Sequence, residues 1–170
     1  MNLREFIRDI PDFPQKGILF RDITPLLKNK EAFEFAINEM CKPFKNEKID
    51  IVVGIEARGL IIAAPIAFNI KAGFVPVRKP GKLPWKTKRR EYELEYGMAI
   101  LEVHEDAINK NDRVLIVDDV LATGGTAKAT AELIKQLGGE VIGFDFLIEL
   151  KDLNGRDVLK EYTLYSLLKL

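Results

Sequence analysis

The chain has 170 residues, which suffices for one domain with a substantial core and is too short to make two domains expected. Its 26 basic and 26 acidic side chains balance, which argues against a dedicated nucleic-acid-binding protein, and a hydrophobic share of 47% excludes a disordered chain. The single cysteine excludes an internal disulfide framework, and the sequence has no Cys/His cluster to hold zinc.

No stretch of the sequence reaches the length of a membrane span. Residues 1–12 mix charged with apolar side chains, which is unlike a secretory signal peptide. We therefore expect a cytoplasmic protein with neither membrane nor nucleic acid among its partners.

The first thirty residues combine a helical pattern with an apolar segment that contains proline. Apolar side chains at helical spacing predict a short amphipathic helix over residues 2–10. Prolines and a glycine exclude a long regular element over residues 13–27. The apolar character of this segment predicts an ordered arm, in which Phe20 could stack on a planar base while Arg21 and Asp22 supply polar contacts. An extended arm that merely packs is the alternative.

The next part of the chain predicts a helix, a strand and a second helix. One apolar face predicts a helix over residues 30–44, and residues 49–53 are expected to form an inner strand. The strand leads into a glycine-bounded turn, residues 54–59, which we call the first glycine turn, and then into an apolar helix over residues 60–70. Such a turn at a helix N-terminus can bind an anion, although turns of this kind occur in any α/β protein.

A strongly basic segment follows a predicted strand at residues 74–77. Residues 78–90 carry seven basic side chains in thirteen positions. A basic run of this kind commonly forms a solvated face or a patch that binds nucleic acid. Three glutamates follow at once, however, and the chain is neutral overall. A mobile lid that closes over an anionic ligand therefore explains the positive and negative charges of this region better. Prolines and a glycine favour a loop here, and Trp85, the sole tryptophan, lies within it.

Residues 114–126 carry the strongest chemical signal in the sequence. Four consecutive apolar residues, 114–117, predict a strand buried on both faces, and Asp118 and Asp119 follow at its carboxyl end. Residues 122–126, Ala-Thr-Gly-Gly-Thr, form a second glycine turn before a helix over residues 127–137. Backbone N–H groups, threonine hydroxyls and the helix dipole together favour a phosphate at such a turn.

The two adjacent carboxylates require a neutral or cationic group between themselves and a bound phosphate. Sugar hydroxyls and hydrated Mg²⁺ both qualify, so a phosphorylated sugar suits the site. An N-cap with incidental surface acids is the alternative, but the strand, the acids and the turn occur in register. The segment lacks the Gly-Lys-Ser/Thr of a Walker A loop and the Gly-x-Gly-x-x-Gly fingerprint of dinucleotide-binding proteins.

The rest of the chain completes an alternating pattern of strands and helices. Residues 98–103 and 141–150 are predicted strands, a short helix begins near Gly155, and residues 162–168 return as a last strand. This alternation predicts a parallel α/β sheet with ligands at the carboxyl ends of its strands, where both glycine turns lie.

Residues 118–126 closely resemble the phosphoribosyl-pyrophosphate-binding motif of the type I phosphoribosyltransferases. The resemblance implies the type I phosphoribosyltransferase fold, an α/β fold with a central, mostly parallel β-sheet flanked by helices. It also implies a single domain, with a small N-terminal hood over residues 1–30 and a flexible catalytic loop over about residues 80–97. Asp118 and Asp119 would contact the ribose and bridge to Mg²⁺. The implied 5′-phosphate contacts are Ala122, Thr123, Gly124, Gly125 and Thr126.

Other segments resemble the adenine phosphoribosyltransferases in particular. Residues 17–27 resemble their hood, and the implied adenine contacts are Leu19, Phe20 and Arg21. Residues 92–97 resemble their flexible catalytic loop, with Glu95 and Tyr96 at its acid and aromatic positions.

The first glycine turn corresponds to the pyrophosphate loop of the family. That loop often contains a cis peptide bond that does not involve proline, and here the bond would be Glu56-Ala57. The implied pyrophosphate contacts are Glu56, Ala57, Arg58, Gly59, Arg78 and Lys82.

Ala122 bears on which purine is used. In phosphoribosyltransferases for hypoxanthine and guanine its position is normally an aspartate that faces the purine N7, and the position of Gly125 is a lysine. Xanthine enzymes can also lack that aspartate, so the hood and the Glu-Tyr loop favour adenine.

The resemblance therefore implies a homodimeric purine-salvage enzyme that joins adenine to phosphoribosyl pyrophosphate and gives AMP and pyrophosphate. Glu95 would handle the purine proton, while Arg78 and Mg²⁺ would stabilise the departing pyrophosphate. A xanthine or other purine phosphoribosyltransferase is one alternative. A purine-sensing regulator on the same fold is another, but such proteins usually add a DNA-binding domain, for which 170 residues leave no room.

Overall fold

The computed structural model describes residues 1–94 and 97–170. Its contacts divide the chain into two compact units, Met1–Glu39 and Met40–Leu170. The smaller unit contains the expected hood, and the larger unit contains both glycine turns.

The smaller unit is built around a two-stranded antiparallel hairpin of β1 (Arg8–Pro11) and β2 (Leu19–Asp22). The helix predicted over residues 2–10 is wrong, because η1 (Leu3–Phe6) is a 3₁₀-helix and the chain then enters β1. Pairing with β2 overrides the helical pattern: Asp9 lies opposite Arg21, and their side chains approach to 2.5 Å. The short α1 (Thr24–Lys28) and α2 (Lys30–Cys41) follow.

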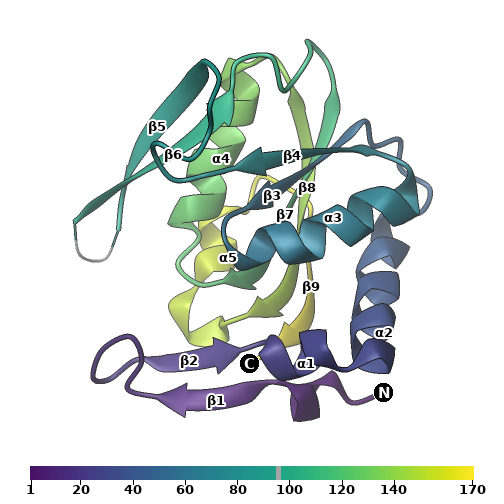
Figure 1. Cartoon of the computed structure of the whole chain (residues 1–170), viewed down its shortest axis with the longest axis vertical. Helices are drawn as coiled ribbons and strands as arrows, with labels where there is room; N and C mark the ends of the chain where they lie inside the picture. The colour runs from purple at the N-terminus through teal and green to yellow at the C-terminus, as the bar shows by residue number, and fades with distance from the viewer. Residues whose placement is uncertain (95–96) are drawn as a thin grey trace. The chain divides into compact units, whose positions relative to one another are not determined.

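The larger unit contains a five-stranded sheet with the order β4-β3-β7-β8-β9, and every neighbouring pair of strands is parallel. Figure 1 shows these strands fanning side by side. The parallel α/β sheet predicted from the sequence is therefore confirmed. The strands are β3 (Ile51–Ile55), β4 (Gly73–Val77), β7 (Arg113–Leu121), β8 (Glu140–Glu149) and β9 (Leu164–Lys169).

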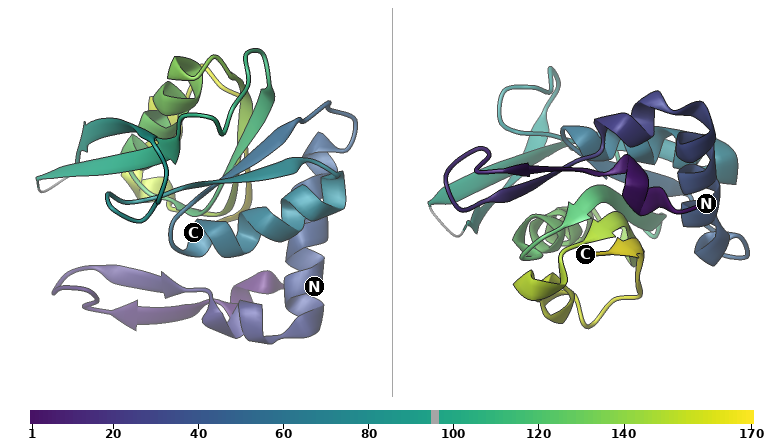
Figure 2. Two further views of the ribbon diagram at one scale, coloured as in Figure 1. Left: turned by 45° about the horizontal axis from the view of Figure 1, so that its top comes forward. Right: turned by 90° about the horizontal axis from the view of Figure 1, so that it is seen from below.

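Two helices, α3 (Arg58–Ile70) and α4 (Gly125–Gln136), cover opposite faces of the sheet (Figure 2). Val53, Ile116 and Phe144 are neighbours in register on one face, in the buried cluster that α4 completes. Gly54 points to the other face, where a Cβ atom would lie 2.8 Å from Ala63 of α3. Among the described residues, no helix is both long and apolar enough to cross a membrane. Short helices complete the unit: η2 (Lys42–Phe44), η3 (Lys151–Leu153) and α5 (Gly155–Val158).

A second antiparallel hairpin joins β5 (Thr87–Glu93) to β6 (Met98–His104). The prediction of a loop throughout residues 78–90 is therefore wrong for its last part. Residues 87–93 form a largely exposed strand, basic in its first part and acidic in its last, that pairs with the apolar strand β6, from Thr87 opposite His104 to Glu93 opposite Met98.

Candidate active site

The second glycine turn follows β7, which is longer than predicted. Asp118 and Asp119 lie inside this strand rather than after it, because β7 keeps its pairing with β8 as far as Leu121. Helix α4 begins at Gly125, and Gly124 before it has a φ of 86°, a conformation that favours glycine. A small cavity of about 70 Å³ opens here and is lined by residues that include Asp118, Ala122, Thr123, Gly124, Thr126 and Phe146.

The two aspartates at this turn have different surroundings. The backbone N–H of Asp119 donates to Asp118 Oδ1 at 2.9 Å, and burial together with the neighbouring Asp119 raises the pKa of Asp118 well above its usual range. Burial also raises the pKa of Asp119, although Arg58 opposes this rise. The Nε atom of Arg58 lies 2.7 Å from Asp119 Oδ2. Burial therefore disfavours the charged form of both carboxylates, and Arg58 offsets part of this effect at Asp119.

The first glycine turn contacts the two aspartates that precede the second one. Arg58 opens α3, and a Cβ atom on Gly59 would collide with the carboxylate of Asp118. The peptide bond Glu56-Ala57 is cis, as the resemblance implied. Because β3 and β7 are adjacent parallel strands, their carboxyl ends bring these turns to one edge of the sheet.

Glu56 ties the first glycine turn to the basic segment. Its carboxylate accepts a hydrogen bond from the Lys79 backbone N–H and lies 3.3 Å from Arg78 Nη2. Burial pushes the pKa of Glu56 up, but these two contacts outweigh burial, and the net pKa is lowered. Arg78 is thus held beside the turn by a carboxylate of the turn itself.

Glu102, which the sequence reasoning missed, holds the rest of the basic segment. Its backbone pairs with that of Arg78, at 2.7 and 2.9 Å. Its buried carboxylate accepts the Gly81 N–H at 3.3 Å and lies 3.1 Å from Arg89 Nη2. Lys82, next to Gly81, is exposed. The signal that could have indicated this role is a single glutamate within the apolar run of β6.

Tyr92 is a second residue that the sequence reasoning did not assign. Its hydroxyl lies 3.2 Å from Thr126 Oγ1, at the second glycine turn. Two residues earlier on the same side of β5, Arg90 Nε lies 2.8 Å from Glu132 Oε2 of α4. The hairpin therefore packs along α4 from Thr126 to Glu132, and its Tyr92 end lies beside the residues predicted to bind phosphate.

Comparisons with known proteins agree with this geometry. The family model described as the phosphoribosyl transferase domain matches residues 25–169. A protein of Thermotoga petrophila named adenine phosphoribosyltransferase is 60% identical over 168 residues, which cover 99% of each chain. The chain belongs to the adenine phosphoribosyltransferase family.

Solved structures of this family agree in fold. The crystal structure of adenine phosphoribosyltransferase from Thermoanaerobacter pseudethanolicus has a TM-score of 0.97 at 51% identity, covering 99% of this chain and 98% of that one. The enzyme from Saccharomyces cerevisiae, solved in complex with adenine and an imino-altritol bisphosphate, has a TM-score of 0.91 at 39% identity, covering 98% of this chain and 96% of that one. The predicted type I phosphoribosyltransferase fold is therefore confirmed.

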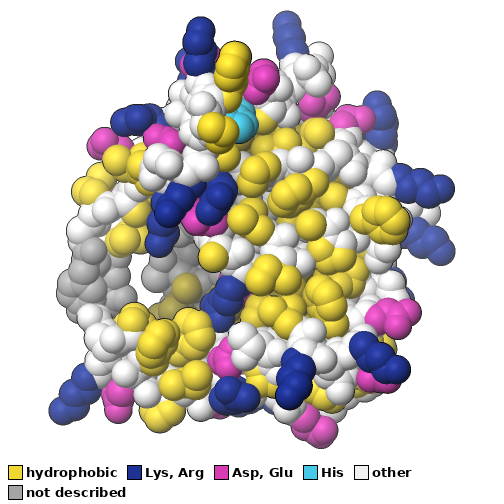
Figure 3. Space-filling model, in the orientation of Figure 1, with side chains coloured by type: hydrophobic (Ala, Val, Ile, Leu, Met, Phe, Trp, Pro, Cys, Tyr) yellow, Lys and Arg dark blue, Asp and Glu magenta, His cyan; other side chains and the backbone are white. Residues whose placement is uncertain are grey.

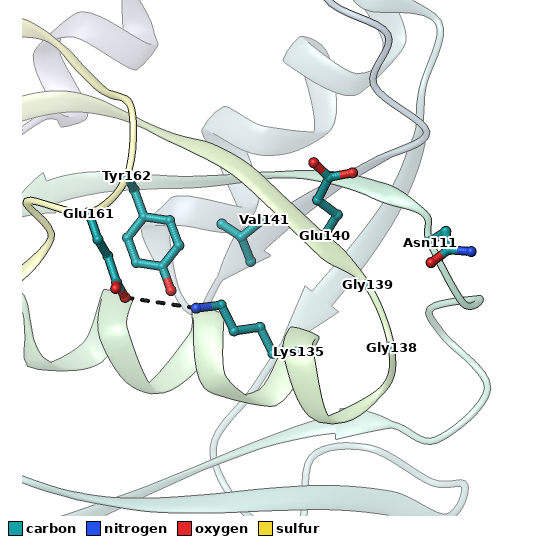
Figure 4. A pocket seen from close by; sticks show the side chains of 8 residues that line it. All are labelled: Asn111, Lys135, Gly138, Gly139, Glu140, Val141, Glu161 and Tyr162. Carbon is teal, nitrogen blue, oxygen red and sulfur yellow. Dashed lines mark ion pairs between the residues drawn. The ribbon is translucent and has the colours of Figure 1, made fainter.

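A larger hollow, of about 510 Å³, lies at the opposite end of the sheet, where β7 and β8 begin (Figure 4). The cation in its lining, Lys135, already lies 3.8 Å from Glu161 and 4.7 Å from the centre of the Tyr162 ring. We do not place the active site there, because parallel α/β sheets bind ligands at the carboxyl ends of their strands.

The structure thus brings together the residues predicted for the two anions, at the first and second glycine turns, and links Arg78 to them through Glu56. Trp85 is 64% exposed, and its backbone N–H donates to His104 Nε2 at 3.3 Å. Leu19, Phe20 and Arg21 lie in the hairpin of the smaller unit. Glu95 and Tyr96 fall outside the described residues.

Proposed function

We infer that the chain transfers the 5-phosphoribosyl group from phosphoribosyl pyrophosphate to adenine and releases AMP and pyrophosphate. The observation that carries this inference is the meeting of two glycine turns at one sheet edge, where Arg58 lies 2.7 Å from Asp119. The substrate bears a phosphate and a pyrophosphate on one ribose, so it needs two separate anion sites with hydrogen-bond acceptors between them. We infer that the base is adenine because the similar proteins are named adenine phosphoribosyltransferase.

We assign the 5′-phosphate to residues 122–126. These residues lead into the 12-residue helix α4, whose first N–H groups and dipole favour an anion. The left-handed Gly124 turns the chain so that the N–H groups can line the cavity beside Asp118. The two threonines of the turn add hydroxyl donors.

We assign the pyrophosphate to the first glycine turn and the basic segment, that is, to Glu56, Ala57, Arg58, Gly59, Arg78 and Lys82. Displacement at the anomeric carbon passes through a state with oxocarbenium character, so the protein contributes positioning and electrostatic stabilisation. Arg58 and Arg78 both form ion pairs with carboxylates of the protein. A bound pyrophosphate would compete with Asp119 and Glu56 for these guanidinium groups.

We propose Mg²⁺ as the cofactor. Within residues 1–94 and 97–170, no group of three or more His, Cys, Asp or Glu side chains could form a dedicated metal cage. Asp118 and Asp119 nevertheless offer adjacent carboxylates, and Mg²⁺ commonly combines one or two carboxylates with waters and substrate phosphates. When bound with the substrate, the ion would neutralise charge that develops on the departing pyrophosphate.

The remaining roles follow from the resemblance and stay predictions. Adenine is assigned to Leu19, Phe20 and Arg21, and the purine proton to Glu95. A loop over about residues 80–97 would close during the reaction and exclude water. Trp85, as the sole tryptophan, should change its fluorescence emission when phosphoribosyl pyrophosphate binds, if the loop closes around it.

We also propose a homodimer and a cytoplasmic location. The support for the homodimer is an exposed apolar surface on α3 and β4, with Ile61, Phe68 and Phe74 exposed by 47%, 83% and 39%. Figure 3 shows hydrophobic side chains gathered over this region. Patches of this kind commonly mark protein–protein contacts. Sedimentation of the protein and of Phe68→Asp tests it, since the charge should shift a dimer towards monomer.

An assay of four bases tests the proposed function. Purified protein is supplied with phosphoribosyl pyrophosphate, Mg²⁺ and adenine, hypoxanthine, guanine or xanthine in parallel. AMP formation from adenine, with much slower use of the other bases, is the expected result. Preference for xanthine would favour another purine phosphoribosyltransferase, and binding without turnover would favour a purine-sensing regulator.

A further inference from the structure

An ion pair between half-buried Arg156 and buried Glu149 joins the last helix of the chain to the sheet. Arg156 of α5 forms two parallel hydrogen bonds to Glu149, the final residue of β8, with Nε–Oε1 at 2.8 Å and Nη2–Oε2 at 2.5 Å. Ser166 Oγ donates to Glu149 Oε2 at 2.5 Å, and Arg156 Nη1 donates to the Leu164 carbonyl oxygen at 3.3 Å. The Arg156 hydrogen bonds lower the pKa of Glu149 from 4.5 to about 2, so the pair stays charged throughout the neutral range.

Helix α5 depends on this pair for its orientation. It has four residues, and no side chain caps its N-terminus, where Asn154 has a φ of 52°. A single helical turn has little stability of its own. The guanidinium group of Arg156 connects α5 to both β8 and β9, two strands of the central sheet.

The first residue of α5 supports the second glycine turn. A Cβ atom on Gly155 would overlap the carbonyl oxygen of Ala122, and one on Gly124 would lie 2.7 Å from the carbonyl oxygen of Gly155. The Leu150 N–H donates to the Leu121 carbonyl oxygen at 2.9 Å immediately before the turn. The backbone of the turn therefore rests on the backbone of α5, with no room for a side chain on either glycine.

We propose that Arg156 and Glu149 are positioning residues for the 5′-phosphate. They hold α5 against residues 122–124 and so fix the direction in which the N–H groups of the second glycine turn point. This proposal rests on the proposed function, which assigns the 5′-phosphate to that turn. It requires that ligands with a 5′-phosphate lose affinity when the pair is broken and that pyrophosphate does not.

The test compares Arg156→Ala and Glu149→Gln with a matched control. Arg113→Ala removes a similar arginine contact, 3.0 Å from Glu47, at the other end of the sheet. Initial rates in both directions should show that the KM values for phosphoribosyl pyrophosphate and AMP rise by about tenfold to a hundredfold in the two variants. The KM for pyrophosphate should stay unchanged. The control should unfold at a lower temperature and keep all three KM values.

Calorimetric titration with ribose 5-phosphate provides a readout that does not need turnover. Its affinity should fall in Arg156→Ala and also in Gly155→Ala, which intrudes on Ala122 without touching the ion pair. Arg156→Lys keeps the positive charge but loses the two parallel hydrogen bonds to Glu149, so its affinity should lie between those of Arg156→Ala and the wild type.

Three results would overturn the proposal. The first is unchanged ribose 5-phosphate affinity in folded Arg156→Ala and Gly155→Ala. The second is an equal rise of the KM values for AMP and pyrophosphate, which is the mark of a general structural effect. The third is wild-type protein that does not bind ribose 5-phosphate. If the wild type binds this ligand but forms no AMP, the proposed function fails, and the affinities of the variants still decide the role of the pair.

Discussion

The turn after β3 and the turn after β7 lie at the same edge of the sheet but keep their shapes by different means. Residues 56–59 carry charged side chains, and ion pairs of Glu56 with Arg78 and of Arg58 with Asp119 hold them. Residues 122–126 carry no charge at all. Their shape comes from a left-handed Gly124 and from close contact with the backbone of Gly155.

This difference separates two ways of binding an anion. At the first glycine turn a ligand must take guanidinium groups from carboxylates of the protein, so binding there depends on charge and on salt. At the second glycine turn the ligand meets backbone groups, so binding depends on the shape of the chain. Substitutions that alter shape should therefore harm the second turn most, and substitutions that alter charge should harm the first.

The largest effect is expected from Gly124→Ala. An L-residue at a φ of 86° costs about 1–2 kcal/mol, and the new Cβ would also lie 2.7 Å from the Gly155 carbonyl oxygen. We expect kcat/KM for phosphoribosyl pyrophosphate to fall by about a hundredfold or more, because the phosphate donors move. The matched control is Gly138→Ala, which has a φ of 92° at the far end of α4. It should lose thermal stability and keep its activity, and an equal loss of activity in both variants would contradict the comparison.

The next largest effect is expected from the aspartates that lie between the two turns. Asp119→Asn removes the anion 2.7 Å from Arg58, and a lost charge-assisted contact is worth about 1.5–3 kcal/mol. The variant should therefore have a lower kcat/KM for phosphoribosyl pyrophosphate. Asp118→Asn should lower kcat/KM by a similar factor, since it also loses the predicted ribose contact, but it should not lose stability.

The effect of Asp118→Asn on stability follows from the pKa of Asp118, which burial and Asp119 raise well above 3.8. Ionisation of such a group costs the folded state stability as the pH rises from about 3.8 towards its raised pKa. Asp118→Asn removes this cost, so its free energy of unfolding should exceed that of the wild type at about pH 7 and match it at about pH 3. Urea unfolding at both pH values measures the difference. A loss of stability at about pH 7 would show that the carboxylate is held in its charged form.

A smaller effect is expected where Glu102 holds the basic segment. Glu102→Gln keeps a hydrogen-bond acceptor for the Gly81 N–H but removes the charge that faces Arg89. The KM for pyrophosphate should rise by about tenfold, because a neutral amide holds Gly81 and Arg89, and with them the segment that carries Lys82, less firmly than a carboxylate, while the KM for AMP should stay unchanged. Glu105→Gln on the same hairpin is the control, since its contact to Lys88 is exposed and 3.7 Å long. A rise in the KM for AMP would contradict the assignment of pyrophosphate and 5′-phosphate to separate turns.

The smallest effect is expected from Tyr92→Phe, which removes the hydroxyl 3.2 Å from Thr126 Oγ1. Thr126 would then be available to a phosphate, so ribose 5-phosphate should bind more tightly by about twofold to tenfold, as expected for one neutral hydrogen bond. Calorimetry measures the change. Weaker binding would instead make the Tyr92 hydroxyl part of the phosphate site.

The sequence by itself determined the parallel sheet, the two large helices and the two glycine turns. These features depend on local signals: buried strands are continuous apolar runs, helices show one apolar face, and an anion-binding turn needs glycines next to a helix start. For the same reason the segment from Asp118 to Thr126 could be assigned to a phosphorylated sugar before any contact was known. The smaller elements were less well predicted, because pairing with a distant strand turned residues 8–11 and 87–93 into strands.

Only the tertiary structure decided which charged groups meet. Arg58 and Asp119 are 61 positions apart, and they face each other because β3 and β7 are neighbours in the sheet. Tyr92 and the Arg156–Glu149 pair carry no local pattern that indicates a role, and the lone glutamate in β6 does not indicate which residues Glu102 contacts. Their partners are set by strand order and by the packing of α5 on the second glycine turn. A contact between distant segments depends on how the whole chain folds, and a short stretch of sequence contains no record of it.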